Sequence, residues 1–95
     1  MFEGLLPIGT VVLLKGSSKR VMIIGVLQNQ ISGSEKLWDY SGCVYPEGFM
    51  GPDKTFLFDS DQIEKIYSVG YQDEEQFSFK TQIDDLWRQL KKSQM

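Results

Sequence analysis

The side chains that carry most enzymatic chemistry are scarce in this sequence. It contains no histidine, so the commonest general acid–base group near neutral pH is missing. Cys43 is the single cysteine, and it therefore cannot form an internal disulfide. It stands between Gly42 and Val44, with no adjacent basic residue to stabilise a thiolate. We therefore expect Cys43 to be a buried structural thiol, and we expect the protein not to be an enzyme.

The acidic pair Asp59 and Asp61 has the alternating spacing with which a calcium-binding loop begins. The glycine and the later bidentate glutamate of such a loop are missing, which favours a turn or a helix cap. A metal site built from histidines and several cysteines is excluded by the composition. The sequence therefore predicts neither a metal site nor a bound cofactor.

Aromatic side chains are the remaining candidates for binding. Five of them fall in segments that are expected to form strands: Trp38, Tyr40, Tyr45, Tyr67 and Tyr71. They could form a ligand-stacking face on a barrel, or they could fill the core, since a 95-residue domain needs large side chains there. We name Trp38, Tyr40 and Tyr45, together with Trp87 further along the chain, as candidate partner-binding residues.

An antiparallel hairpin near the start of the chain is the element against which the rest can be arranged. It joins two apolar runs, Leu5–Leu14 and Val21–Leu27, through the polar turn Lys15–Arg20. Gly25 interrupts the second run and predicts a bend or bulge, as at the corner of a small barrel. Three further strands are expected between turn residues: Lys36–Tyr45, Thr55–Phe58 and Ile66–Tyr71.

The last element is an amphipathic helix. Asp73 with Gln76 three residues later resembles a capping box and predicts a start near Asp73, which we prefer to a start near Thr81. One apolar stripe at helical spacing is expected to face the sheet: Phe79, Ile83, Leu86 and Leu90. Trp87 flanks this stripe, where it is either the outer edge of the core or an anchor for a protein partner.

These elements predict a single domain over residues 1–95 of the α+β class. We expect a small, bent antiparallel sheet or an SH3-like half-barrel of about five strands, with one C-terminal helix packed on it. The net charge of −3 and the scattered basic residues argue against a nucleic-acid partner. No apolar run approaches the ~20 residues of a membrane-spanning helix, and no signal peptide is recognisable. We expect a cytoplasmic protein that binds no membrane; its oligomeric state is left open.

Several structural motifs, taken in their order and spacing, resemble those of a known family. They are Leu6-Pro7-Ile8-Gly9-Thr10-Val11-Val12-Leu13-Leu14, Lys19-Arg20-Val21-Met22-Ile23-Ile24-Gly25, Trp38-Asp39-Tyr40, Tyr45-Pro46-Glu47-Gly48, Phe58, Ile63, Ile66 and Gly70-Tyr71. Over about residues 5–90 the chain resembles small uncharacterised Firmicutes proteins encoded beside type VII (ESX-like) secretion genes and LXG toxins. None of these motifs is catalytic.

The resemblance implies a cytoplasmic accessory protein that binds a secreted toxin before export, as a chaperone or a targeting factor. Small size and mild acidity also fit an immunity protein, because an acidic face can cover a basic catalytic cleft. A small-ligand-binding barrel that uses the aromatic face is a third hypothesis. The toxin domain retained in a pull-down, the export region or the toxic domain, would separate the first two.

Overall fold

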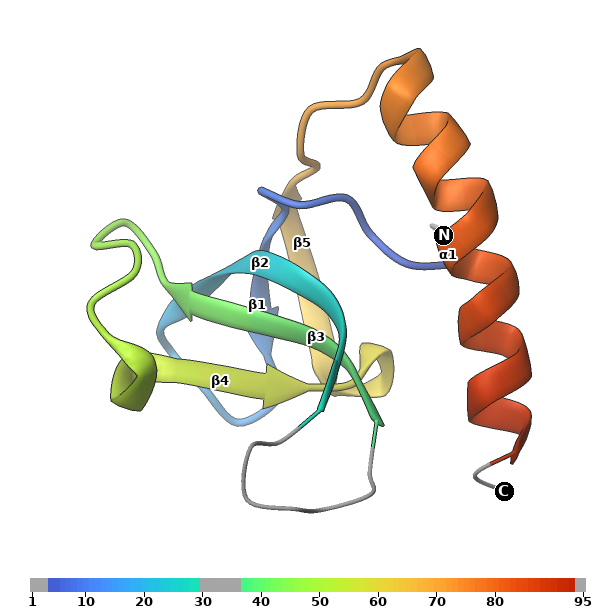
Figure 1. Cartoon of the computed structure of the whole chain (residues 1–95). Coiled ribbons are helices and arrows are strands. Elements are labelled where there is room, and N and C mark those ends of the chain that lie inside the picture. Colours follow the sequence, from blue (N-terminus) through green and yellow to red (C-terminus); the bar gives the residue numbers. More distant parts are fainter. Residues whose placement is uncertain (1–3, 30–36, 94–95) are drawn as a thin grey trace.

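The five expected strands form one open, bent antiparallel sheet, and a single helix stands beside it (Figure 1). The computed structural model describes residues 4–29 and 37–93 of the chain. Its elements are β1 (Val11–Leu14), β2 (Arg20–Asn29), β3 (Leu37–Val44), the short 3₁₀ helix η1 (Pro52–Lys54), β4 (Thr55–Phe58), the 3₁₀ helix η2 (Ser60–Gln62), β5 (Ile63–Ser68) and α1 (Glu74–Ser93). The strand order is β4-β3-β2-β1-β5, so β4 and β5 are the two edges. The predicted fold class is confirmed.

The hairpin at the start of the chain is present, and β2 is its long arm. Val11 pairs with Met22 and Leu13 with Arg20, which confirms the predicted turn between the two runs. The pairing of β2 with β3 shifts register between Ile23 and Gly25, so a bulge forms at the predicted glycine. The bulge bends β2, so its two halves face different parts of the curved sheet. This explains why apolar residues occupy both faces of the strand.

The concave side of the sheet holds the core. Its buried members come from four strands and from the segment that precedes β1: Leu5, Leu6, Val12, Val21, Ile23, Tyr40 and Phe58. The rings of Tyr40 and Phe58 lie 5.5 Å apart between centroids and pack against each other at a tilt. Cys43 is a free thiol with 0% exposure, as predicted for a structural cysteine.

The last strand lies earlier in the chain than the predicted Ile66–Tyr71. It occupies Ile63–Ser68, because η2 ends at Gln62 and leads directly into pairing with β1. Beyond it, the Gly70 N–H donates to Thr10 Oγ1 over 3.0 Å, and the chain turns against the backbone at Ile8. A Cβ atom on Gly70 would lie 2.0 Å from the Ile8 carbonyl oxygen, so only glycine permits this approach. The chain leaves the sheet at this point.

The helix begins at the predicted place. Gln76 N–H donates to Asp73 Oδ1 over 2.9 Å, so Asp73 caps the helix, and Glu74 and Glu75 occupy its first turn. The longer of the two expected helices is therefore confirmed. The segment that precedes β1 crosses from the helix to the sheet (Figure 1).

Candidate protein-binding surface

The C-terminal half of α1 is attached to the sheet by a buried carboxylate. Asp39 on β3 is only 3% exposed, and its Oδ1 accepts a 2.7 Å hydrogen bond from the indole Nε1–H of Trp87. Its Oδ2 accepts a 2.8 Å bond from the backbone N–H of Ser60 at the start of η2. One side chain therefore connects a central strand, the helix and the short 3₁₀ turn.

Lys91 completes this attachment one turn further along the helix. Its Nζ lies 3.1 Å from both Asp39 Oδ1 and Asp59 Oδ1, and it donates to the Leu37 carbonyl over 3.2 Å. Burial alone would lower the pKa of Lys91, but the two carboxylates outweigh it and raise the pKa above the ordinary value of 10.5. The ammonium group is therefore charged at any physiological pH.

The middle of α1 is attached through the segment that precedes β1. Asp84 is 6% exposed; its Oδ1 accepts a 2.8 Å bond from the Leu5 N–H, and its Oδ2 pairs with Lys80. The next N–H, that of Leu6, points the other way and donates over 2.9 Å to the hydroxyl of Tyr40. Burial raises the pKa of that hydroxyl above its ordinary 10.0, and the hydrogen bonds from Ser60 and Leu6 offset only part of the effect.

These polar contacts set the rotation of the helix, and the prediction that its apolar stripe faces the sheet is largely wrong. Only Ile83 of the stripe packs against the core, together with Trp87. Phe79, Leu86 and Leu90 are 49%, 45% and 37% exposed. At roughly 100° per residue, the stripe is centred about 90° around the helix from the side that carries Asp84, Trp87 and Lys91. The bonds made by Asp84, Trp87 and Lys91 turn this polar side toward the sheet.

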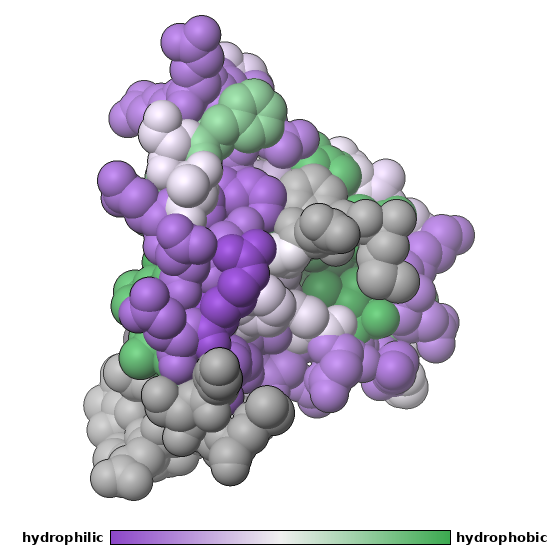
Figure 2. Space-filling view, turned by 90° about the vertical axis from the view of Figure 1, so that its right-hand side faces the viewer, coloured by the Kyte–Doolittle hydropathy of each residue, from purple (hydrophilic) through white to green (hydrophobic). Residues whose placement is uncertain are grey.

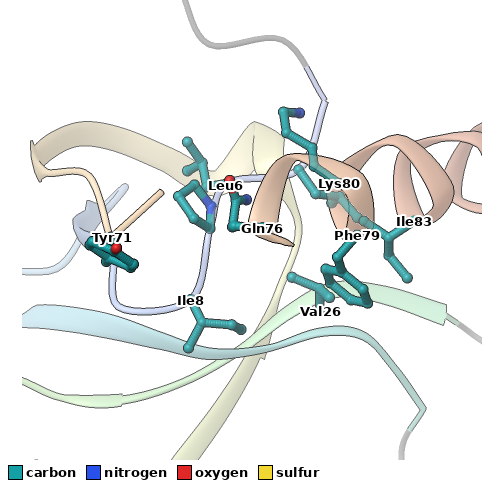
Figure 3. Close-up of a pocket in the computed structure, with 10 residues that line it drawn as sticks. Leu6, Ile8, Val26, Tyr71, Gln76, Phe79, Lys80 and Ile83 are labelled. Atoms are coloured by element: carbon teal, nitrogen blue, oxygen red, sulfur yellow. The ribbon is translucent and has the colours of Figure 1, made fainter. Parts of the chain in front are cut away.

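A small pocket opens where the stripe meets the segment that precedes β1 (Figure 3). Its volume is about 80 Å³, and it is lined by Leu5, Leu6, Pro7, Ile8, Val26, Tyr71, Gln76, Phe79, Lys80 and Ile83. Figure 3 places Phe79 and Ile83 of the helix close above Val26 of β2. Pockets for small-molecule ligands usually measure about 300–1,000 Å³, so this one suits a single apolar side chain.

Two larger grooves lie beside the edge strands β5 and β4. One, of about 330 Å³, is bounded by β5 and the core residues Leu6 and Tyr40. The other, of about 310 Å³, lies at the hairpin turn between Leu14 and Phe56 and is flanked by Lys15 and Lys19. Both volumes fall at the lower limit for small-molecule sites.

The four candidate partner-binding residues do not share one surface. Tyr40 is 1% exposed and belongs to the core, while Trp38 is half-buried on the neighbouring position of β3. Tyr45 is half-buried at the end of β3, with the Arg20 guanidinium 5.1 Å from its ring centroid. Trp87 is half-buried in the helix–sheet contact. Partner binding by these residues stays a prediction.

The residues that organise the helix contact were missed at the sequence level. Asp39 lies between two aromatic residues in a strand, and Asp84 follows the apolar Ile83 in a helix. A carboxylate in such a position is seldom buried unless it has hydrogen-bonding or charged partners. The positions of Asp39 and Asp84 were therefore the signal that could have pointed to buried polar contacts. Its partners, Trp87 for Asp39 and Leu5 for Asp84, are remote in sequence and could not be named from it.

Other chemistry is sparse within the described part of the chain. Residues 4–29 and 37–93 contain no group of three or more side chains that could hold a metal ion. Asp59 serves as the cap of η2, as expected, because its backbone N–H and side chain bond with Gln62 in a capping box. Among the helices of the same residues, none combines the length with the apolar character that a membrane crossing requires.

The fold and this surface define a small α+β domain in which a bent five-stranded sheet carries a C-terminal helix with a partly exposed apolar stripe. The chain belongs to the family described as a domain of unknown function, DUF4176, whose sequence profile matches residues 5–79. The match ends within α1, before Asp84, Trp87 and Lys91. No curated protein and no solved structure matches the chain.

Proposed function

We propose that this protein is a non-enzymatic accessory protein that binds a secreted toxin of the LXG type before its export by a type VII secretion system. In this role it would act as a chaperone or a targeting factor in the cytoplasm. The resemblance of its motifs to proteins encoded beside such secretion genes supports this function. Membership of the DUF4176 family is compatible with it and adds no activity of its own.

The observation that carries the proposal is the amount of apolar surface left open on so small a domain. Large hydrophobic residues that are more than a third exposed include Ile8, Phe49, Met50, Phe56, Ile66, Tyr67, Val69, Tyr71, Phe77, Phe79, Leu86 and Leu90. Scattered single residues of this kind are ordinary, but here Val69, Tyr71, Phe77 and Phe79 follow one another closely around the start of α1. Such surfaces mark sites of protein–protein contact more often than sites of catalysis.

The test is a pull-down with two fragments of the toxin encoded in the same locus. The tagged full chain is mixed separately with the N-terminal export region and with the C-terminal toxic domain. Retention of the export region supports an accessory role. Retention of the toxic domain alone, with loss of its toxicity, would replace the proposal with an immunity function.

A matched variant shows whether the apolar surface is responsible. Val69→Asp changes an exposed residue beside the start of the helix, whereas Phe49→Asp changes an exposed residue on the loop after β3. We expect Val69→Asp to weaken retention by at least about tenfold, which corresponds to about 1.4 kcal/mol, and Phe49→Asp to weaken it much less. Equal retention by both variants would place the contact elsewhere. Recovery of a bound small molecule by native mass spectrometry would instead favour a ligand-binding barrel.

A further inference from the structure

The apolar stripe of α1, made of Phe79, Ile83, Leu86 and Leu90, has a spacing that reads the same in both directions. Successive members are separated by four, three and four residues. This is the a/d spacing of two heptads, which forms a seam when a second helix lies alongside. Reversal of the chain direction places Phe79 opposite Leu90 and Ile83 opposite Leu86. The stripe is therefore complementary to itself about a two-fold axis between Ile83 and Leu86.

From this geometry we propose that the stripe is a dimer interface, in which α1 pairs antiparallel with α1 of a second copy of this chain. The proposal does not depend on the proposed function. Phe79, Leu86 and Leu90 are 37–49% exposed in the single chain, so between a third and a half of the surface of each is open to a partner, whereas Ile83 also packs against the core. The helix contains 20 residues, about 30 Å at 1.5 Å per residue, which is enough for the whole seam.

The position of the stripe on the molecule permits this approach. Figure 2 views the molecule from the helix side: the outermost helix surface is hydrophilic, and hydrophobic atoms emerge along its left margin. The bulk of the molecule lies to the right of the helix in this view. A second copy placed at the left margin and related by a two-fold axis would extend away to the left.

Charge also favours an identical partner in this orientation. The flank of the seam that faces away from the sheet carries Gln82 and Gln89, which are uncharged and do not repel their copies. The first turn of the helix carries Glu74 and Glu75. Antiparallel pairing brings this acidic end beside the C-terminal end of the other helix and opposes the two helix dipoles. The net charge of −3 on each copy is thus not concentrated at the seam.

The pocket beside the stripe extends the contact beyond the helix pair. Because Phe79 faces Leu90 of the second copy, that leucine lies at the mouth of the 80 Å³ pocket. The pocket wall includes Ile8 and Tyr71, which are 48% and 81% exposed. A seam of two heptads is small compared with the about 800 Å² per partner of a stable interface, and these two residues enlarge it.

The first test is sedimentation equilibrium of the full chain over a range of concentrations. We expect a reversible monomer–dimer equilibrium. Leu86→Lys, at an exposed position in the centre of the seam, should raise the dimer dissociation constant by at least about 100-fold, because each dimer would bury two unpaired charges. Its far-UV circular dichroism should not change. Phe77→Lys is the matched control: Phe77 is 52% exposed on the same helix, roughly 150° away from the seam, and its variant should dimerise normally.

The second test fixes the orientation of the two helices. In an antiparallel pair Gln82 of one copy lies near Gln89 of the other, so Gln82→Glu combined with Gln89→Lys should tighten the dimer. Gln82→Lys combined with Gln89→Lys should weaken it, by like-charge repulsion. In a parallel pair Gln82 of one copy would not lie near Gln89 of the other, so the dissociation constants of the two double variants would not differ in this way.

Three outcomes would overturn the proposal. The wild-type chain could be monomeric at every concentration, Leu86→Lys could dimerise as well as wild type, or Phe77→Lys could abolish the dimer equally. A monomeric wild type whose Leu86→Lys variant loses a different protein in a pull-down would assign the stripe to that protein instead. Because the toxin pull-down and the sedimentation experiment use different binding partners, one proposal can fail while the other holds.

Discussion

The sheet and the helix contact are held together by different kinds of interaction. The core under the sheet is almost entirely apolar, with Val12, Ile23 and Phe58 at 0–1% exposure. The contact between α1 and the sheet depends on two buried carboxylates, those of Asp39 and Asp84. Apolar burial is not directional and dictates only that a face is covered. Hydrogen bonds have narrow geometry and decide which face of a helix is turned inward.

The largest effect is expected in the sheet. Phe58→Ala removes a fully buried ring and should lower the free energy of unfolding by about 3–5 kcal/mol, much of what a small domain has. Urea denaturation followed by circular dichroism measures it. Phe56→Ala, the same change two residues earlier on β4 at a 42% exposed position, is the control and should cost much less. Similar losses for both variants would contradict the location of the core.

An intermediate effect is expected at the helix contact. Asp39→Asn and Trp87→Phe each weaken the bond between the indole and the carboxylate, and each should cost about 1.5–3 kcal/mol, as bonds to charged groups do. A double-mutant cycle should give a coupling energy of at least about 0.5 kcal/mol. Arg88→Gln breaks the exposed pair with Asp85 on the same helix and should change stability by less than about 1 kcal/mol. Additive losses from Asp39→Asn and Trp87→Phe would show that the bond does not hold the helix.

The smallest effect is expected from alkaline titration. The pKa of Lys91 is raised above 10.5, so the folded state retains this proton to higher pH than the unfolded chain. The stabilisation is complete at neutral pH and is lost as the pH rises through the folded-state pKa. The raised pKa of Tyr40 acts in the same direction above 10.0. Thermal melts should therefore show stability falling above about pH 10, and the fall should be shallower in Lys91→Met. If stability falls with pH as steeply in that variant as in the wild type, Lys91 does not stabilise the contact.

The contrast between the two regions also explains what the sequence could predict. Strands and turns follow from local chemistry: β-branched runs formed β1 and β2, Gly25 marked the bulge, and Asp73 marked the helix start. The burial of Cys43 followed from its apolar strand. Each of these features depends on neighbours within a few residues.

The rotation of α1 depends on residues far away in the sequence. Periodicity identified the apolar stripe correctly as a feature of the helix, but it assumed that the stripe would be buried. Trp87 bonds to a residue 48 positions away and Asp84 to one 79 positions away, and no spacing within the helix encodes these partners. The start of β5 was missed for a related reason, because the length of η2 decides where pairing with β1 resumes.

The hydrogen bond between Leu5 and Asp84 has a consequence for synthesis on the ribosome. The carboxylate that accepts the Leu5 N–H is made 79 residues after Leu5 itself. The hydroxyl that accepts the neighbouring Leu6 N–H belongs to Tyr40, which is made 34 residues after Leu6. Until these partners emerge, the N–H groups of Leu5 and Leu6 lack their native acceptors, and closing so long a loop is slow. The segment that precedes β1 therefore completes its native contacts late, and it is most open to capture by other proteins during that interval.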